Sequence, residues 1–162
     1  MNQYSLVILK PDAVQRRLTG TIIQRFENAG LKIHAARFEM INAEMSKQHY
    51  AEHVEKSFYP SLESYITSGP IFIMVLSGFE AIGKIRRMIG ETVPAKAAPG
   101  TIRGDFSHQG NSSEVDSKNQ SPLRNLIHAS ANVEDAKREI ALWFQPEEMI
   151  DYPLADDYLH GI

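Results

Sequence analysis

Short apolar runs alternate along the chain with polar segments, and proline, glycine or asparagine marks most of the breaks between them. Residues 4–9 form a β-branched and apolar run that stops at Lys10-Pro11-Asp12, which predicts a strand followed by a turn. Residues 31–41 and 71–76 predict two more strands, and the nearly continuous apolar sequence of 71–76 is typical of a central strand. Residues 124–129 predict a fourth strand.

Segments whose apolar residues recur at helical spacing separate these strands. Thr19 is a predicted N-cap and Gly30 a predicted stop, while Asn132 and Pro146 mark the two ends of the last helix. The predicted helices cover residues 19–30, 42–53, 60–68, 80–90 and 132–146.

This order of elements favours an α+β fold, a ferredoxin-like βαββαβ sandwich with a four-stranded antiparallel sheet and an extra helical pair. A chain of 162 residues is long enough for one good core, so residues 1–162 are expected to form a single domain. Residues 91–123 are expected to be mostly irregular, and the Ser-, Asn- and Gln-rich stretch at about 107–123 to be a polar insertion. Because this fold hosts many functions, function has to be argued from particular residues.

Composition narrows the choice of function. The net charge of -3, with no dense Lys/Arg run, argues against a protein that mainly grips nucleic-acid backbone. The chain has no cysteine, which excludes a disulfide framework, a thiolate metal site and a thiol nucleophile. No apolar stretch approaches the roughly 20 residues that a bilayer requires, and the polar N-terminus shows no signal sequence. We therefore expect a soluble, cytoplasmic protein without a membrane partner.

Any phosphate chemistry in this chain must depend on side chains, because the glycine-rich phosphate-binding motifs and the common hydrolase motifs are missing. The candidate groups are the cations Lys10, Arg86 and Arg103 and the hydroxyls of Tyr50 and Thr92. Each cation alone fits an ordinary solvated surface. However, Lys10 follows a strand and Arg103 lies in a glycine-flanked loop, positions at which binding sites often form.

His128 is the candidate nucleophile, at the end of the fourth predicted strand. In an extended strand it would share one face with Leu126, and Ile127 would lie on the other. Spacing alone favours a semi-buried histidine without a catalytic role. A neutral imidazole nevertheless has a lone pair that can attack phosphorus and later release it. Ser130 and Glu139 are close enough in sequence to orient the second ring nitrogen.

Seven short motifs follow one another along the chain. They are Lys10-Pro11-Asp12-Ala13-Val14-Gln15-Arg16, His49-Tyr50, Ser68-Gly69-Pro70, Gly90-Glu91-Thr92, Pro99-Gly100-Thr101-Ile102-Arg103-Gly104-Asp105-Phe106, Asn125-Leu126-Ile127-His128-Ala129-Ser130 and Glu139-Ile140-Ala141-Leu142-Trp143-Phe144. Together they resemble the nucleoside diphosphate kinases, in the same order as in that family and from about Tyr4 to Tyr152. As a set they are highly specific, although each one alone is weak.

The resemblance implies a ping-pong reaction in which His128 carries the terminal phosphate from a nucleoside triphosphate to a nucleoside diphosphate. It implies that Ser130 and Glu139 hold the histidine, that Asn125 and Lys10 contact the ribose, and that Phe58, with Leu62 beside it, stacks on the base. The implied phosphate ligands are Lys10, Tyr50, Arg86, Thr92 and Arg103.

The resemblance also implies cofactor and partners. Mg²⁺ would be held mainly through the nucleotide phosphates, without a metal site made by the protein itself. The substrates would be ATP, GTP, CTP, UTP and their deoxy forms with the matching diphosphates, and no nucleic acid would be required. The chain would form a homo-oligomer, a hexamer or tetramer built from dimers.

Two departures from the family pattern and two alternatives remain open. After the histidine the family commonly has Gly-Ser-Asp-Ser, whereas this chain has Ala129-Ser130-Ala131-Asn132. The segment 107–123 is longer than the usual connection, which suggests a flap at the nucleotide entrance or a subunit contact.

One alternative is a ferredoxin-like nucleic-acid-binding or regulatory module without catalysis. The other is a metal site at His49 and His53, which have i, i+4 spacing but no obvious third ligand.

Overall fold

A four-stranded antiparallel sheet forms the centre of the molecule, in the order β2-β3-β1-β4. The computed structural model describes residues 1–107 and 123–155. The strands are β1 (Asn2–Leu9), β2 (Lys32–Glu39), β3 (Ile71–Phe79) and β4 (Ile127–Ala129). The predicted α+β, ferredoxin-like fold is confirmed, since helices alternate with these strands along the chain.

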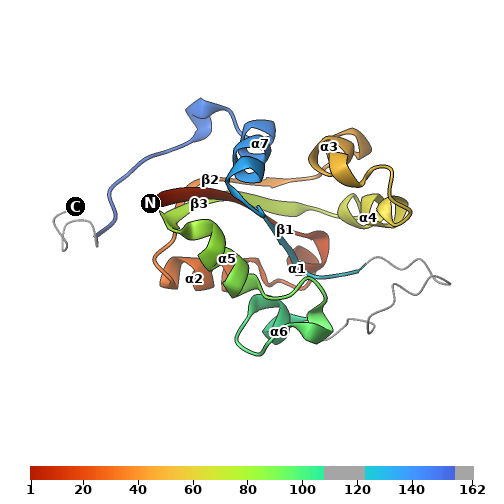
Figure 1. Cartoon of the computed structure of the whole chain (residues 1–162), viewed down its shortest axis with the longest axis horizontal. Coiled ribbons are helices and arrows are strands. Elements are labelled where there is room, and N and C mark those ends of the chain that lie inside the picture. The colour runs from red at the N-terminus through yellow and green to blue at the C-terminus, as the bar shows by residue number, and fades with distance from the viewer. Residues whose placement is uncertain (108–122, 156–162) are drawn as a thin grey trace.

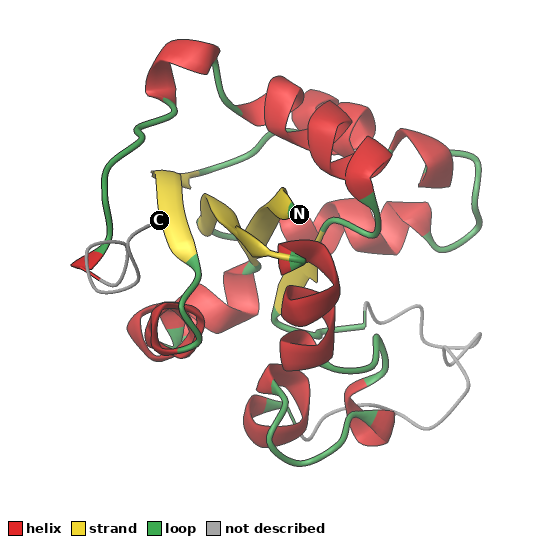
Figure 2. Cartoon of the chain, turned by 60° about the vertical axis from the view of Figure 1, so that its left-hand side comes forward, coloured by secondary structure: helices red, strands yellow, loops and turns green. Residues whose placement is uncertain are grey.

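Helices cover both faces of the sheet (Figures 1 and 2). In Figure 1, α3, α4 and α7 lie on one side of the strands, and α2, α5 and α6 lie on the other. The helices are α1 (Pro11–Gln15), α2 (Thr19–Asn28), α3 (Ala43–His49), α4 (Tyr59–Ile66), α5 (Ala81–Ile89), α6 (Ile102–Phe106) and α7 (Val133–Trp143), with short 3-10 turns at Ala51–His53, Pro94–Lys96 and Pro146–Glu148. No helix of the described residues has the length and apolar character needed to span a membrane.

The central strands are apolar on both faces because each face carries its own core. In β1, Val7 and Leu9 pack into the core beneath α2 and α5, whereas Leu6 and Ile8 pack into the core beneath α4 and α7. Side chains of a strand point alternately to opposite faces, so a strand covered on both sides becomes a continuous apolar run. The prediction that residues 71–76 form a central strand is confirmed, since β3 lies between β2 and β1.

The fourth strand is shorter than predicted, and its register is different. Residues 124–126 lie outside β4, and Leu126 has a positive φ of 67°. Its backbone is held by two bonds, since Leu126 N donates to Asp12 Oδ2 at 3.2 Å and Leu126 O accepts from Lys10 N at 2.8 Å. Leu126 consequently packs in the same core as Ile127. The prediction that Leu126 shares a face with His128 is wrong, because the left-handed residue breaks the alternation.

Several helix boundaries also differ from the prediction. The helix expected over 42–53 ends at His49 and is followed by a separate 3-10 turn, and Thr19 is the first residue of α2 rather than its cap. Two helices, α1 and α6, lie where a turn and irregular chain were expected. Asn42 and Asn132 do cap helices as predicted, each accepting a hydrogen bond from a backbone amide. Apart from its two ends, the predicted insertion at 107–123 lies outside the described residues.

Candidate active site

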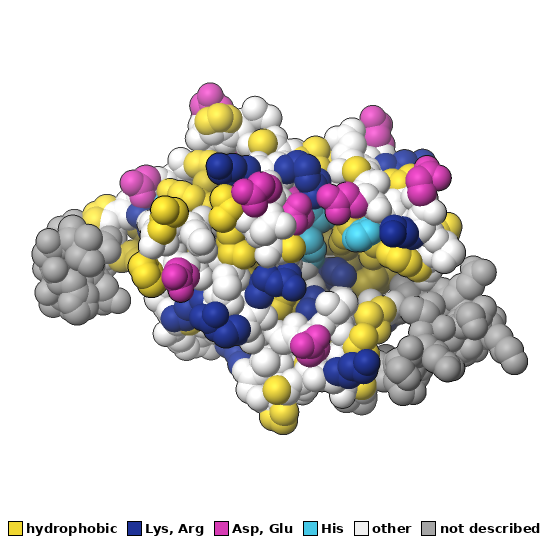
Figure 3. Space-filling view, viewed as in Figure 1, with side chains coloured by type: hydrophobic (Ala, Val, Ile, Leu, Met, Phe, Trp, Pro, Cys, Tyr) yellow, Lys and Arg dark blue, Asp and Glu magenta, His cyan; other side chains and the backbone are white. Residues whose placement is uncertain are grey.

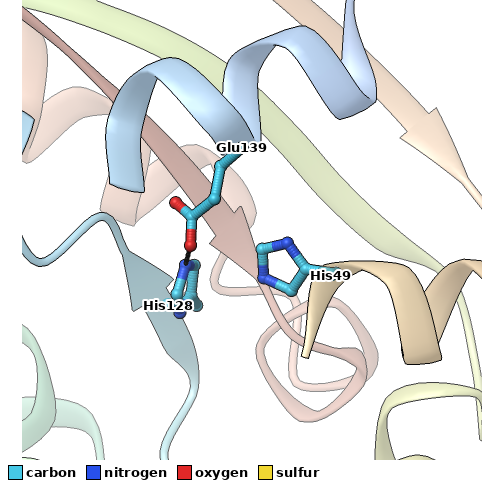
Figure 4. Close-up of side chains that lie close together, drawn as sticks. All are labelled: His49, His128 and Glu139. Carbon is cyan, nitrogen blue, oxygen red and sulfur yellow. Dashed lines mark hydrogen bonds and ion pairs between the residues drawn. The ribbon is translucent and has the colours of Figure 1, made fainter. Parts of the chain in front are cut away.

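His128 and Glu139 form the centre of a polar site at the end of β1 (Figure 4). The distance from His128 Nε2 to Glu139 Oε1 is 2.9 Å, and Ser130 Oγ donates to Glu139 Oε2 at 2.6 Å. Burial alone would raise the pKa of Glu139, but the hydrogen bonds from His128 and Ser130 and the charge of His128 lower it overall. Glu139 is thus a carboxylate and can only accept, so His128 donates from Nε2 and keeps the lone pair on Nδ1.

Strand pairing and a helix cap place these groups. β4 pairs with β1, which sets His128 opposite Ile8. The chain then bonds again to β1, because Leu6 N donates to Ser130 Oγ at 3.0 Å and Ser130 N donates to Leu6 O at 3.1 Å. Asn132 caps α7 immediately afterwards, so that the buried Glu139 faces the sheet. His128 and its hydrogen-bond acceptor Glu139 are therefore held by a strand and a helix rather than by loops.

Lys10 lies buried at the end of β1, where its Nζ donates to Asn125 Oδ1 at 2.7 Å. Burial and, to a smaller extent, the charge of Arg103 together lower the pKa of Lys10 to about 7, against an opposing effect from Asp12. The positive charge is poorly compensated by the protein. An anionic ligand near Nζ would stabilise the charged form.

Arg103, on α6, ties the backbone around β4 together and still has free donors. It donates from Nε to Asn125 O at 3.1 Å, from Nη1 to Gly90 O at 2.8 Å and from Nη2 to Ile127 O at 2.6 Å. A guanidinium has five N–H groups, so two are left for a ligand. Burial and the charge of Arg86 lower its pKa to about 10. These two arginines form no ion pair within the described residues, which suits an anion between them.

The hydroxyl of Tyr50 is buried and has no hydrogen-bond partner among the described residues. Burial raises the pKa of Tyr50, so this group is an uncharged donor at neutral pH. A buried hydroxyl without a partner is unfavourable by about 1–3 kcal/mol, which a ligand oxygen would offset. Nearby, Asn125 Nδ2 donates to Thr92 O at 3.0 Å, and the Thr92 side chain is exposed.

Phe58, directly before α4, exposes 43 % of its surface, and Leu62 on the first turn of α4 packs against the core. A partly exposed aromatic ring next to a helix that is anchored in the core can stack on a flat ligand. In the space-filling view histidine side chains show at the middle of one face, with lysine and arginine side chains beside and below them and acidic side chains above (Figure 3). The structure thus brings a histidine, several cations and an aromatic ring to one region.

The sequence did not predict that His49, at the end of α3, lies beside His128. Its ring lies 4.7 Å from the ring of His128, centroid to centroid. Ligand atoms of His49, His128 and Glu139 all lie within 4.8 Å of one another, and His53 does not belong to this cluster. The alternative of a metal site at His49 and His53 gains no support from this grouping, which joins His49 to His128 and Glu139 instead. No spacing signal connects His49 with His128, because they come from distant parts of the chain and His49 is placed by the contact of α3 with α7, where Trp143 bonds to it.

Comparisons with known proteins point to one family. The family model described as nucleoside diphosphate kinase matches residues 3–149. A nucleoside diphosphate kinase from Rhodopirellula baltica is 49% identical over 152 residues, which is 94% of this chain and 92% of the relative. One from Pyrococcus horikoshii is 47% identical over 156 residues, covering 96% of this chain and 94% of the relative.

Solved structures match over nearly the whole chain as well. The transition state mimic of nucleoside-diphosphate kinase from Borrelia burgdorferi, with bound vanadate and ADP, has a TM-score of 0.90 and 38% identity over 96% of this chain and 95% of its own. A halophilic nucleoside diphosphate kinase from Halobacterium salinarum in complex with CDP has a TM-score of 0.85 and 41% identity over 98% of both chains.

Proposed function

This chain belongs to the nucleoside diphosphate kinase family, and we propose that it moves the terminal phosphate of a nucleoside triphosphate to a nucleoside diphosphate through a phosphate on His128. The observation that carries the assignment to His128 is its hydrogen bond to Glu139. That bond leaves Nδ1 as the free nucleophilic nitrogen, and Figure 4 shows it pointing away from Glu139.

In the first half-reaction the Nδ1 lone pair attacks the terminal phosphorus, and the bond from that phosphorus to the bridging oxygen breaks. The diphosphate leaves with that electron pair. The ring now carries phosphate on Nδ1 and hydrogen on Nε2, so it is positively charged, and the carboxylate of Glu139 stabilises this charge. In the second half-reaction a terminal oxygen of the acceptor diphosphate attacks the phosphorus, and the Nδ1–P bond breaks.

The phosphates of the nucleotide would lie among the cations, where transfer depends mainly on positioning and on charge stabilisation. Lys10 and Arg103 are buried and hold unused donors, and Tyr50 offers a buried hydroxyl without a partner among the described residues. The side chains of Arg86 and Thr92 are exposed, and they would bind the phosphates of the nucleotide from the solvent side.

The ribose and the base would be bound without recognition of base identity. Asn125, already bonded to Lys10, would contact the ribose hydroxyls together with that lysine. Phe58 would stack on the base, with Leu62 supporting the ring. Stacking tolerates every base because each has a π-face. This arrangement supports use of ATP, GTP, CTP, UTP and their deoxy forms with the corresponding diphosphates.

Mg²⁺ would be bound through the phosphates, since the buried carboxylates of the site are already used. Asp12 accepts hydrogen bonds from Tyr65 Oη and Leu126 N, and Glu139 accepts from His128 and Ser130. When bound with the nucleotide, the ion would shield phosphate charge. The protein's own part is to position the nucleophile and to supply fixed donors.

Incubation with γ-labelled ATP tests the proposal. The label should appear on the protein as an acid-labile, base-stable adduct and should be chased by GDP or CDP. It should be absent in His128→Gln and present in the matched control His53→Gln, a histidine outside the His128 cluster. Label that persists in His128→Gln would show that another residue carries the phosphate.

A homo-oligomer, hexamer or tetramer, is part of the same proposal. It is supported by two large apolar side chains beside the edge of the sheet, Phe38 on β2 and Met40 just after it, which are 62% and 60% exposed. Light scattering on the purified chain would give the number of subunits.

Deletion of the segment 107–123 should change nucleotide KM or the number of subunits, and unchanged values of both would remove its proposed role. Single-domain organisation and a cytoplasmic location stay predictions.

A further inference from the structure

Trp143 fixes the tautomer of His49. Trp143 Nε1 lies 3.1 Å from His49 Nδ1, and both side chains are buried. An indole nitrogen can only donate, so Nδ1 of His49 must be the accepting lone pair. A neutral imidazole carries one hydrogen, which is then on Nε2. Burial, followed by the charge of His128, lowers the pKa of His49 to about 3, so the ring stays neutral at any working pH.

The hydrogen on His49 Nε2 faces the nucleophile. Nε2 is buried and has no hydrogen-bond partner among the described residues. The planes of the two histidine rings are 82° apart, and Figure 4 shows His49 turning an edge, with Nε2 leading, toward the face of His128. An N–H group directed at the electron-rich face of a neutral ring is weakly attractive. This contact restrains the ring of His128, whose own Nε2 is bonded to Glu139.

The same cluster has the composition of a zinc site. Two imidazoles and one carboxylate, with ligand atoms within 4.8 Å of one another, resemble the donor sets that bind Zn²⁺. A metal requires a lone pair on the nitrogen that faces it, and Trp143 places a hydrogen there instead. The other tautomer of His49 would set an N–H against the indole N–H.

We propose that His49, locked by Trp143, is a positioning residue that restrains His128 and prevents transition metals from binding the nucleophile. The positioning role rests on the proposed function of His128, whereas the tautomer and the exclusion of metal do not. An enzyme whose substrates arrive with divalent cations needs its nucleophile free of metal.

Nitrogen NMR of the untagged wild-type protein with ¹⁵N-histidine tests the tautomer without any substitution. His49 should show a protonated Nε2 and an unprotonated Nδ1. A hydrogen on Nδ1 would overturn the proposal at its first step.

Metal binding is tested with Co²⁺ alone, without nucleotide, by visible absorbance, and the chain has no cysteine that could add thiolate ligands. Trp143→Phe removes the indole N–H and frees His49 to present a lone pair. This variant should bind one Co²⁺ at least about tenfold more tightly than the wild type. The double variant W143F/H49F should return to the wild-type level. Equal binding by the wild type and Trp143→Phe would overturn the metal-excluding role.

The positioning role is tested with two matched substitutions. His49→Asn keeps an acceptor near the position of Nδ1 but has no N–H at His128, whereas His49→Gln can place an amide N–H near the position of Nε2. Phosphoenzyme formation from ATP should be about two- to fivefold slower in His49→Asn, the size expected for losing one weak contact between an N–H group and a ring face, with nucleotide Kd unchanged. His49→Gln should recover part of this loss. A wild-type rate in His49→Asn would overturn the role, while labelling of His128 in the wild type tests the proposed function separately.

Discussion

Binding of a nucleoside diphosphate at pH 8 should take up close to one proton per site, and Lys10 should be the group that binds it. In the free protein burial holds the pKa of Lys10 at about 7, with Arg103 lowering it and Asp12 opposing. One unit above that pKa, only about a tenth of the side chains are charged. A polyanion beside Nζ should return the pKa to at least its ordinary value of 10.5, where almost all are charged.

The expected uptake is therefore about 0.9 proton per nucleotide, and charging Lys10 at pH 8 costs about 1.4 kcal/mol of binding free energy. Calorimetric titrations of ADP with Mg²⁺ in two buffers of different ionisation enthalpy measure the uptake directly. A diphosphate is used so that no phosphate is transferred.

Two variants identify the group. Lys10→Met should abolish the uptake, and Lys137→Met, which removes an exposed lysine of α7, should leave it unchanged. Uptake near zero in the wild type, or full uptake in Lys10→Met, would refute the reasoning.

Four further outcomes are expected. Glu139→Gln should slow phosphoenzyme formation about 10- to 100-fold in rapid-quench assays, because the charge-assisted bond to His128 is lost; an unchanged rate would contradict the role of Glu139. Tyr50→Phe should lower kcat/KM about tenfold without lowering the free energy of unfolding in urea, since its hydroxyl has no partner among the described residues; lost stability with full activity would contradict this. Phe58→Ala should raise KM about tenfold for purine and pyrimidine nucleotides alike, and a loss confined to one base class would oppose simple stacking. The pKa of Lys10 is lower in the folded than in the unfolded state, so the unfolded state binds more protons between about pH 7 and 10.5. The free energy of unfolding in urea should therefore rise with pH in that window, and it should rise more in the wild type than in Lys10→Met.

The strands were predictable because their physical causes are local. Apolar runs covered on both faces mark β1 and β3, and Asn42 and Asn132 are caps that act within one turn. The two short helices α1 and α6 were not predictable from periodicity, since five residues hold little more than one turn. Thr101, whose side chain accepts from Gly104 N, was the available signal for α6.

The site was only partly predictable, because its geometry depends on contacts between distant segments. The start of the fourth strand was predicted too early because Leu126 is left-handed, and that conformation is stabilised by Asp12 and by the backbone of Lys10. The nearness of His49 to His128 was not predicted, since it depends on the packing of α3 against α7. Arg103 was expected to bind phosphate, but nothing in the sequence indicated that it also bonds three backbone carbonyls.

The nitrogen that carries the phosphate is the most direct test of the account. Protein labelled with ¹⁵N-histidine can be phosphorylated with ATP, and the phosphoenzyme can then be examined by nitrogen–phosphorus NMR. The hydrogen bond from His128 Nε2 to Glu139 predicts phosphate on Nδ1 of His128, with Nε2 still protonated. Phosphate on Nε2, or on any other residue, would contradict the account.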